Sequence, residues 1–474
     1  MEGQRLDKVD SPRLLCIGTN INLNKIRSFI VRLNSKINRK HERGISRREF
    51  MAVATALTVV PSGVLGRSGN VPPSNKLNIA GVGVGGVGRA YLQGVNSENI
   101  IALCDVDDKY AANTYKLYPK AKIYHDFRKM LEKDKSIDAV VIGTPDHTHA
   151  VVASTAIKMG KHVYCAKPLT KTVYESRMLA HAAREAKVCT QMSVQSDASE
   201  SQRILCEWIW DGAIGPVREV HVWSNRPIWP QGIERPKNTP PVPVGLDWDM
   251  WLGPTPYRPY HPAYVPFKWR GWWDFGTGAL GDMGCHTLAH ISRALKLGHP
   301  TSVHASSTKL FPETAPTASM VHYDFPTRED MPAVKLTWYD GGLKPRRPEG
   351  LEDVRQLGAE GLIFIGEKAS MLCGFTGESP RIIPETRMKQ YKRPPKILPR
   401  SIGHYKEWIE ACKGGESAGC NFDIGGPLTE IVLLGNIAIR TGKKLNWDGE
   451  NMKITNVPKA NDYLHYEYRK GWTL

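Results

Sequence analysis

Short apolar runs alternate with longer, helix-like stretches over residues 75–195. The helix-like stretches, such as 150–159 and 174–185, repeat apolar positions every three to four residues. The apolar runs are the segments 77–82, 99–105, 122–126, 139–144, 162–166 and 188–194. This alternation predicts parallel strands with helices on both faces of one sheet. We therefore expect the first half of the chain to be a doubly wound α/β domain.

The pattern changes at about residue 196. Residues alternate between apolar and polar in the segments 218–229, 302–311, 318–326 and 333–342, and no helical stretch separates the last three. Such alternation predicts strands with one face toward water, so we expect a mostly antiparallel sheet within residues 196–474. Two late helices are predicted, at 405–411 and 428–441.

Tryptophan is concentrated in one part of the second half. Seven of the chain's thirteen tryptophans lie between residues 223 and 273, in a stretch that is also rich in proline. Aromatic faces stack well on sugar rings, so these side chains could form a carbohydrate platform. The alternative is that they pack the core of a long ordered loop, and the sequence leaves both interpretations open.

A glycine-rich turn, GVGVGGVGRA (81–90), follows the first apolar run. Two registers fit G-x-G-x-x-G, and we choose Gly83, Gly85 and Gly88 because the helical pattern begins at Arg89. In a dinucleotide-binding turn the first glycine permits a sharp bend and the second lets the backbone approach the pyrophosphate. The third allows the helix to pack closely on the strand. With a strand before it and a helix after it, the motif predicts a Rossmann dinucleotide-binding domain.

Asp105 ends the second predicted strand, 17 residues after Gly88. An acid at this position accepts hydrogen bonds from the adenosine ribose hydroxyls and repels a 2′-phosphate. The sequence therefore favours NAD over NADP as the cofactor.

Other polar residues follow the ends of predicted strands, where doubly wound sheets bind ligands. TPDHTH (144–149) follows one strand, and Lys167 follows another. A lysine there is either a solvated strand tip or a cation fixed in an active site, and we favour the second. The residues assigned to the cofactor at these strand ends are Thr144, Pro145, His147, Lys167 and Gln195.

A second glycine-rich turn leads into a predicted helix within residues 272–298. Asp282 and His286 lie four residues apart and so share a helix face. A carboxylate beside an imidazole orients the ring and raises its basicity, which suits general acid–base catalysis. Two alternatives stay open: a metal site that adds His290, and a helix cap at Asp282 with core histidines.

Residues 44–66 have the layout of an export signal, with basic residues before a short apolar stretch. Ser46–Met51 (SRREFM) resembles the twin-arginine signal, so we expect an exported, periplasmic protein. The alternative is an ordinary basic amphipathic helix in a cytoplasmic protein. The apolar stretch is too short to span a bilayer, and no stable membrane span is expected after signal removal.

Net charge changes this picture little. The formal charge is +17, but residues 1–70 hold 13 Lys and Arg against 5 Asp and Glu, while the remaining residues hold 51 against 42. No basic stripe with interleaved aromatics is present, which disfavours nucleic acid as a partner. The nine cysteines are scattered without a C-x-x-C pair, so neither a zinc site nor a disulfide framework is expected.

Together these motifs resemble the Gfo/Idh/MocA oxidoreductases, the family of glucose-fructose oxidoreductase and inositol dehydrogenase. The resemblance extends from about residue 76 to the C-terminus. It rests on the glycine turn, Asp105, TPDHTH, the AKP of 166–168 and GALGDMGCH (278–286). It implies a Rossmann domain over 75–195 and a substrate-binding and oligomerisation α/β domain over 196–474. Family members usually transfer hydride between NAD(P) and a sugar or cyclic polyol.

The resemblance also implies roles for single residues. Lys167 matches a lysine that contacts substrate and nicotinamide, and Asp282 and His286 match the catalytic acid and histidine of the family. We expect His286 to take the hydroxyl proton, Asp282 to orient His286, and Lys167 to stabilise negative charge on the same oxygen. Ala166 replaces the glutamate that usually precedes this lysine, and His290 stands where an acid is common.

The predicted function is hydride transfer between NAD and a secondary alcohol of a sugar, glycoside or inositol. One alternative is a glycosidase that recycles NAD through oxidation, elimination, addition and reduction. A second alternative is a non-catalytic sensor of NAD or sugar. The wet sheet face also predicts a homo-oligomer, either a dimer or a tetramer.

Overall fold

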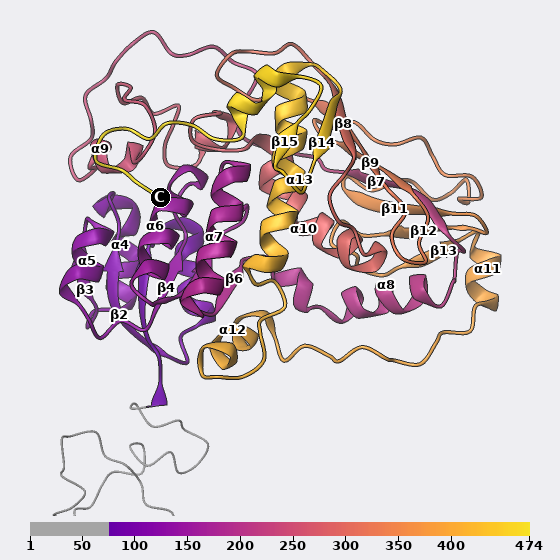
Figure 1. Ribbon diagram of the computed structural model, residues 1–474, viewed down its shortest axis with the longest axis horizontal. Coiled ribbons are helices and arrows are strands. Elements are labelled where there is room, and N and C mark those ends of the chain that lie inside the picture. Colours follow the sequence, from indigo (N-terminus) through magenta and orange to yellow (C-terminus); the bar gives the residue numbers. More distant parts are fainter. Residues whose placement is uncertain (1–74) are drawn as a thin grey trace, which may run out of the picture. The chain divides into compact units, whose positions relative to one another are not determined.

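Six parallel strands form the sheet of the first domain in a computed structural model of the chain, which describes residues 75–474 (Figure 1). The predicted export signal lies outside the described residues. The strands run in the order β3-β2-β1-β4-β5-β6, and every neighbouring pair is parallel. They are β1 (Asn78–Val82), β2 (Asn99–Cys104), β3 (Lys122–Tyr124), β4 (Ala139–Ile142), β5 (His162–Cys165) and β6 (Thr190–Met192). The doubly wound sheet expected from the apolar runs is confirmed.

Five helices connect these strands. They are α3 (Gly86–Gly94), α4 (Asp108–Leu117), α5 (Phe127–Lys133), α6 (Asp146–Lys158) and α7 (Val173–Ala186). Local sequence explains where α7 begins, because Thr172 and Glu175 cap each other's backbone amides. Helix α3 begins at Gly86, three residues before the predicted start. This earlier start places the first turn of the helix inside the glycine-rich segment.

Nine strands form the sheet of the second domain, in the order β13-β12-β11-β7-β10-β9-β8-β14-β15. Strands β7 and β10 are parallel and the other pairs are antiparallel, as the alternating pattern predicts. The first four in sequence are β7 (Val217–Trp223), β8 (Ser302–Ser307), β9 (Ser319–Phe325) and β10 (Val334–Tyr339). The remaining five, which the sequence reasoning did not identify, are β11 (Gly361–Gly366), β12 (Ser370–Cys373), β13 (Arg381–Ile383), β14 (Leu445–Asp448) and β15 (Lys453–Ile454).

Helices of the second domain fill the space between the two sheets. Helix α13 (Phe422–Thr441) packs against β8, β9 and α7, and α10 (Gly278–Leu295) lies between α13 and α8 (Glu200–Trp210). Within residues 75–474, α13 is the one helix long and apolar enough to cross a membrane, but it is largely buried and reads as a core helix. Shorter helices are α9 (Trp248–Leu252), α11 (Glu385–Gln390), α12 (His404–Cys412), η3 (Gln195–Ala198), η4 (Lys268–Gly271) and η5 (Pro458–Tyr463).

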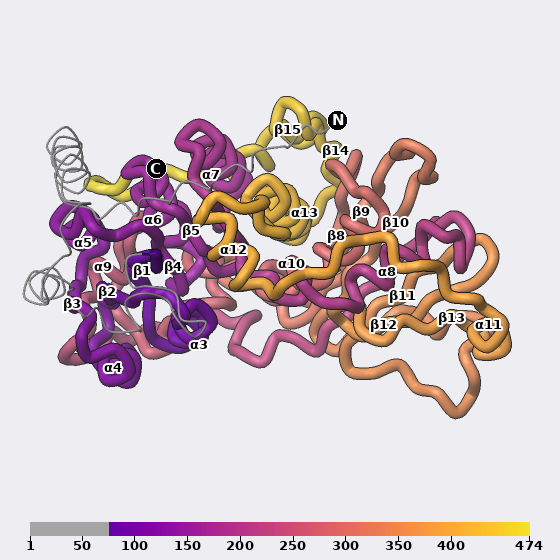
Figure 2. Tube along the Cα trace, turned by 90° about the horizontal axis from the view of Figure 1, so that it is seen from below, coloured from indigo at the N-terminus to yellow at the C-terminus, as the bar shows by residue number. Residues whose placement is uncertain are grey.

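Parts of the second half return to the first domain. The segment 243–275, which we call the cover, carries α9 back beside α4 and α5, and the C-terminal end lies near α6 (Figures 1 and 2). Backbone hydrogen bonds join Asp108 N to Gly245 O at 2.9 Å and Asp247 N to Val106 O at 2.8 Å. The predicted boundary at residue 196 therefore separates the two sheets but does not separate the packing of the two halves.

Candidate active site

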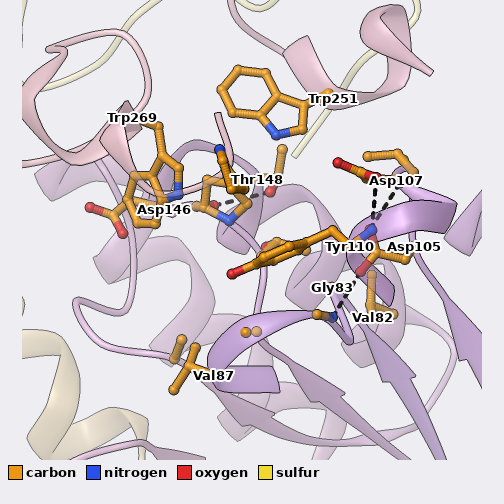
Figure 3. A pocket seen from close by; sticks show the side chains of 18 of the residues that line it. Val82, Gly83, Val87, Asp105, Asp107, Tyr110, Asp146, Thr148, Trp251 and Trp269 are labelled. Atoms are coloured by element: carbon orange, nitrogen blue, oxygen red, sulfur yellow. Dashed lines mark hydrogen bonds between the residues drawn. The ribbon is translucent and has the colours of Figure 1, made fainter. Parts of the chain in front are cut away.

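A cavity of about 390 Å³ lies at the carboxyl end of the first sheet. Its lining from the first domain includes the glycine turn, Asp105, Asp146 and Lys167, and its lining from the second includes Trp251, Trp269, Arg270 and Asp282. Figure 3 shows Trp251 and Trp269 across the cavity from Gly83 and Val87, with the ring of Tyr110 between them. The sequence-predicted strand ends and the cover thus enclose one site.

The glycine turn has the geometry that the chosen register requires. Gly83 has φ +71°, and a Cβ there would lie 2.6 Å from the Thr144 side chain. A Cβ on Gly88 would overlap the carbonyl oxygen of Gly83, so α3 packs directly on the turn. A Cβ on Gly85 would run into the Tyr110 ring. The first and third positions therefore need glycine for the fold, and the second keeps the turn open toward the cavity.

The N-terminus of α3 faces the cavity with unused amides. Gly85 is the N-cap and has no side chain that could bond to the first turn, where Gly86 and Val87 line the cavity. First-turn amides have no acceptor within a helix and attract anions such as a pyrophosphate. The Tyr110 ring covers this turn, but the residue is 43% exposed, so a pyrophosphate could displace the ring toward solvent.

Asp105 lines the cavity and is held by the turn beside it. Its carboxylate accepts hydrogen bonds from the amides of Val84 at 2.7 Å, Gly85 at 3.0 Å and Asp107 at 3.0 Å. Burial raises the pKa of Asp105, and these amide hydrogen bonds offset part of that rise. The carboxylate is thus fixed at the tip of β2, where the sequence placed a ribose acceptor.

Thr144 and Pro145 also line the cavity, at the end of β4. The Thr144 hydroxyl is buried and has no hydrogen-bond partner within residues 75–474. An unsatisfied buried hydroxyl in a cavity wall is a place for a ligand's polar group. Together with the free first-turn amides and the fixed Asp105 carboxylate, it shows that the residues present fit a dinucleotide.

Two of the predicted cofactor residues do not face the cavity. His147 is fully buried, and its ring nitrogens lie 2.8 Å from the Trp251 carbonyl oxygen and 3.2 Å from that of Phe275. Burial lowers the pKa of His147 to about 3, so the ring is neutral and ties α6 to the cover. Gln195 donates to the hydroxyls of Tyr164 at 3.3 Å and Tyr405 at 3.4 Å, away from the cavity lining.

Lys167 and Asp282 meet at the cavity wall. The Lys167 ammonium donates to Asp282 Oδ1 at 3.0 Å and to the Asp282 carbonyl oxygen at 2.6 Å. The guanidinium of Arg270 donates from Nε to the same Oδ1 at 3.0 Å. Burial alone would raise the pKa of Asp282, but Lys167 and Arg270 together lower it to about 2. The acid is therefore ionised at every physiological pH and holds two cations beside the cavity.

The expected pairing of Asp282 with His286 is not formed. Both lie on α10, but the Asp282 carboxylate is directed to the two cations, and no hydrogen bond joins it to His286 among the described residues. Burial and the neighbouring Lys167 lower the pKa of His286 to about 3, so the imidazole is neutral. His286 does not line the cavity. The predicted pairing is wrong because two cations outside α10, Lys167 and Arg270, hold the Asp282 carboxylate.

Asp146 is a buried acid within TPDHTH for which the sequence predicted no role. It is 3% exposed, lines the cavity, and accepts a hydrogen bond from the Thr277 hydroxyl at 2.7 Å. Burial raises its pKa to about 7. A carboxyl near half-protonation at neutral pH can either donate or accept a hydrogen bond inside the site.

The tryptophan-rich stretch is mainly a core. All seven side chains are at least nine-tenths buried, and in the cover Trp248 and Trp251 stack with ring centroids 4.7 Å apart. Two of the seven, Trp251 and Trp269, also line the cavity. The packing interpretation is therefore right for most of them, and the expected platform is wrong except at these two positions.

Neither of the two alternatives left open for α10 matches the structure. His290 is fully buried and contacts Gln202 and Ser196, so it does not join Asp282 in a ligand set. Asp282 lies in the second turn of α10 and not at its start, so it is no helix cap.

Ala166, which replaces the usual glutamate, lines the cavity beside Lys167. Asp282 supplies the carboxylate that this lysine would otherwise lack.

Arg270 is the main site residue that sequence reasoning missed. It lies in η4, and its guanidinium sits 4.3 Å from the Trp269 ring centroid and 4.4 Å from that of Phe267. The run KWRGWW places an arginine among aromatics that can fix it by cation–π contact. That run could have indicated a fixed arginine, although it contains nothing that identifies Asp282 as the partner of Arg270.

The fold and the cavity define a two-domain protein whose cavity fits a dinucleotide. Two models of one oxidoreductase family match the chain in succession. The model for the NAD-binding Rossmann fold matches residues 77–194, and the model for the C-terminal alpha/beta domain matches residues 223–326. Over these two segments, which together make up slightly less than half of the chain, the sequence is similar to this family, the Gfo/Idh/MocA oxidoreductases.

Relatives of known function share part of the chain. Levoglucosan dehydrogenase of Pseudarthrobacter phenanthrenivorans is 25% identical over 44% of this chain and 46% of its own length. Inositol 2-dehydrogenase 1 of Saccharopolyspora erythraea is 28% identical over 31% of this chain and 44% of its own length. This chain thus matches less than half the length of either relative. The solved structure of the WlbA dehydrogenase from Bordetella pertussis with NADH and UDP-GlcNAcA is 16% identical, with a TM-score of 0.56 over 79% of this chain and 99% of that one, which shows the shared fold.

Proposed function

We propose that the chain transfers hydride between a bound nicotinamide dinucleotide and a secondary alcohol of a sugar, glycoside or cyclic polyol. The observation that carries this proposal is the Lys167 ammonium, which lines the same cavity as the glycine turn and is held by Asp282. A cation fixed in a cavity wall is suited to stabilise an oxygen that gains negative charge.

When bound, the nicotinamide ring accepts or donates the hydride. The chain would hold the dinucleotide with the first-turn amides of α3, the Asp105 carboxylate and the Thr144 hydroxyl. Asp105 also disfavours a 2′-phosphate by charge repulsion, which supports NAD over NADP. Lys167 and Asp282 are each only 14% exposed at their side chains, which strengthens the electrostatic contact between them.

At the substrate, Lys167 would donate a hydrogen bond to the hydroxyl oxygen. Asp282 keeps the ammonium in place through two contacts, and Arg270 holds Asp282 from the other side. His286 is neutral and therefore has a lone pair, but it does not line the cavity, so it would receive the hydroxyl proton through a bridging water molecule. Its pKa of about 3 makes His286 a weak base, so we assign the larger part of the rate enhancement to Lys167.

Several features favour a carbohydrate as the substrate. Trp251 and Trp269 present aromatic surface to the cavity, and Arg270, Asp282 and Asp146 present charged or polar groups. A sugar has both an apolar ring face and hydroxyl groups, so it matches this mixture. Relatives named for levoglucosan and inositol act on compounds of the same class.

A second candidate is a redox-neutral reaction, such as the glycosidase that recycles NAD. The observation that favours it is the cover, which is bonded to the β2–α4 turn at one end and to α6 through His147. The tail adds Arg469, which donates from its amide to the Pro254 carbonyl oxygen at 2.9 Å. A cofactor beneath such a cover would leave slowly, and slow release suits a reaction that reoxidises it in place.

The two candidates are separated by incubating the purified chain with NAD and a panel of pyranosides, glycosides and inositols. NADH is followed by absorbance and the products by mass spectrometry. Accumulating NADH with a product two hydrogens lighter supports the dehydrogenase. A cleaved glycoside without net NADH supports the redox-neutral reaction. Cofactor binding without turnover of any compound would contradict both and leave a sensor.

A further inference from the structure

Three side chains from distant parts of the sequence meet at the outer edge of the first sheet. His162 begins β5, Cys189 precedes β6, and Cys412 ends α12. Their nitrogen and sulfur atoms all lie within 4.8 Å of one another, and all three residues are half-buried. This group lies outside the lining of the active-site cavity and has no part in the reaction proposed above.

The histidine in this group is already engaged. His162 Nδ1 accepts a hydrogen bond from the amide of Cys189 at 2.9 Å. In the neutral ring the other nitrogen then carries the proton, so neither nitrogen has a lone pair available for a metal ion. Two thiols and no free imidazole make a poor zinc site, because structural zinc takes four ligands. The available chemistry is therefore that of a thiol pair.

The backbones on both sides of this pair are held in place. The carbonyl oxygen of Cys189 accepts from the Val163 amide at 3.0 Å, which fixes the edge of the sheet. On the other side, Tyr405 of α12 stacks on Tyr164 of β5 with ring centroids 5.5 Å apart. Figures 1 and 2 show α12 next to this edge of the first sheet. The two sulfurs thus stay close in the folded chain.

The sulfur positions are close to those needed for a bond. Cys189 Sγ lies 3.1 Å from the carbonyl oxygen of Ala411, the residue directly before Cys412. A disulfide needs sulfurs about 2.05 Å apart and Cβ atoms about 3.8 Å apart. The two sulfurs, which lie within 4.8 Å of each other, must therefore move closer together before they can bond.

The two thiols also differ in reactivity. A hydrogen bond from Cys412 lowers the pKa of Cys189 to about 7, whereas burial raises the pKa of Cys412. The thiolate is the attacking form in thiol–disulfide exchange, so Cys189 is the nucleophile and Cys412 the resolving thiol.

We propose that Cys189 and Cys412 form a disulfide that fastens α12 to the edge of the first sheet under oxidising conditions. With oxidised glutathione as the oxidant, the Cys189 thiolate attacks one glutathione sulfur and releases one glutathione thiolate. The Cys412 thiolate then attacks Cys189 and releases the second. The chain loses two electrons and two protons, and the glutathione disulfide gains them as two thiols.

Such a bond would close a long loop, because the two cysteines are 223 positions apart in sequence. Cross-links across long loops restrict the unfolded chain most strongly, so the oxidised protein should be the more stable form. The proposal does not depend on which reaction the cavity supports, and its test does not use activity.

The full chain is equilibrated with oxidised or reduced glutathione, blocked with iodoacetamide, digested and analysed by mass spectrometry without reduction. The expected result is a linked peptide pair containing Cys189 and Cys412, two hydrogens lighter than the thiol forms. The melting temperature should be higher by roughly 5 °C in the oxidised sample. Alkylation of both thiols after oxidation would overturn the proposal.

Cys189→Ser and Cys412→Ser should each abolish the linked peptide and the shift in melting temperature, and Cys373→Ala should keep both. Cys373 is a buried cysteine in β12 and serves as the matched control. A second result would also overturn the proposal. If the untreated protein binds one Zn²⁺ per chain and loses it in both serine variants, the thiols are metal ligands.

Discussion

The two walls of the cavity present different kinds of chemical groups to a ligand. The wall from the first domain offers mainly backbone: the first-turn amides of α3 and a carboxylate held by three amides. The wall from the second domain offers side chains. Arg270 and Trp251 come from the cover, and Asp282 comes from α10. Lys167 lies in the first domain, but its ammonium contacts Asp282 of the second domain, so it connects the two walls.

This difference separates binding from chemistry. Backbone amides can hold any dinucleotide phosphate but need glycine to let the ligand approach, so damage there should weaken affinity. Side-chain charges act where the reaction changes charge, so damage there should lower turnover. Each prediction below tests whether the two walls can be separated in this way.

The largest effect is expected for Lys167→Met, which keeps the length of the side chain and removes its charge. Turnover should fall by about 10²- to 10³-fold, because one stabilising donor at the reacting oxygen is lost. The dissociation constant for NAD, followed by tryptophan fluorescence, should change less than about threefold. Lys116→Met, at an exposed position on α4, is the control. Unchanged turnover in Lys167→Met would remove the lysine from the mechanism.

Gly88→Ala should act in the opposite way. The new Cβ overlaps the carbonyl oxygen of Gly83, so either α3 or the turn must move. NAD affinity should fall by about 100-fold, and a chain saturated with NAD should keep most of its turnover. Gly298→Ala, where a Cβ meets no atom within 4 Å, is the matched control. Normal NAD affinity in Gly88→Ala would contradict the assigned register.

Asp146→Asn tests the raised pKa in the cavity. Wild-type Asp146 has a pKa of about 7 when folded and about 4 when unfolded, so folding takes up a proton between these values. Wild-type stability should therefore fall as pH rises from about 4 to 7, and the asparagine variant should lack this loss. Urea unfolding at pH 5 and pH 8 should show a relative gain for the variant of about 2 to 4 kcal/mol at pH 8. Equal pH dependence in both proteins would show that the carboxyl is ionised as usual.

The smallest effect is expected for the cover. Trp251→Ala removes an aromatic ring that lines the cavity and packs on His147, with ring centroids 5.1 Å apart. Bound NAD should dissociate about 10-fold faster, and Trp251→Phe should restore most of the retention because it keeps an aromatic face. The measurement mixes the NAD-loaded protein with an excess of a competing nucleotide and follows the change in tryptophan fluorescence as NAD dissociates. Equal dissociation rates in all three proteins would show that the cover does not retain the cofactor.

The parts of the site that could be read from the sequence are local ones. The glycine turn, Asp105 and Lys167 each lie at the end of one strand, and strand periodicity places them at one edge of a parallel sheet. The same argument fails for His147 and Gln195, because it identifies the edge without fixing the direction of a side chain. Their positions depend on the cover and on α12, which are distant in sequence.

Other features depend on contacts that no short pattern contains. Arg270 reaches Asp282 only because the cover folds back, and proline and tryptophan give that segment no helical or strand period. The Asp282–His286 spacing was read correctly as one helix face, but the competition from two cations decided the carboxylate's partner. The thiol pair at Cys189 joins positions more than 200 residues apart, so only the fold could reveal it.

The most direct test of the account follows the hydrogen itself. Glucose and myo-inositol carrying deuterium at every carbon are incubated with the chain and NAD, and the nucleotide is extracted after denaturation and weighed by mass spectrometry. Where reduced cofactor is released, the account predicts NADH one mass unit heavier than the unlabelled form, and labelling slower by about 10²- to 10³-fold with Lys167→Met. Oxidised substrate together with accumulating unlabelled NADH would contradict hydride transfer from the substrate carbon to the cofactor.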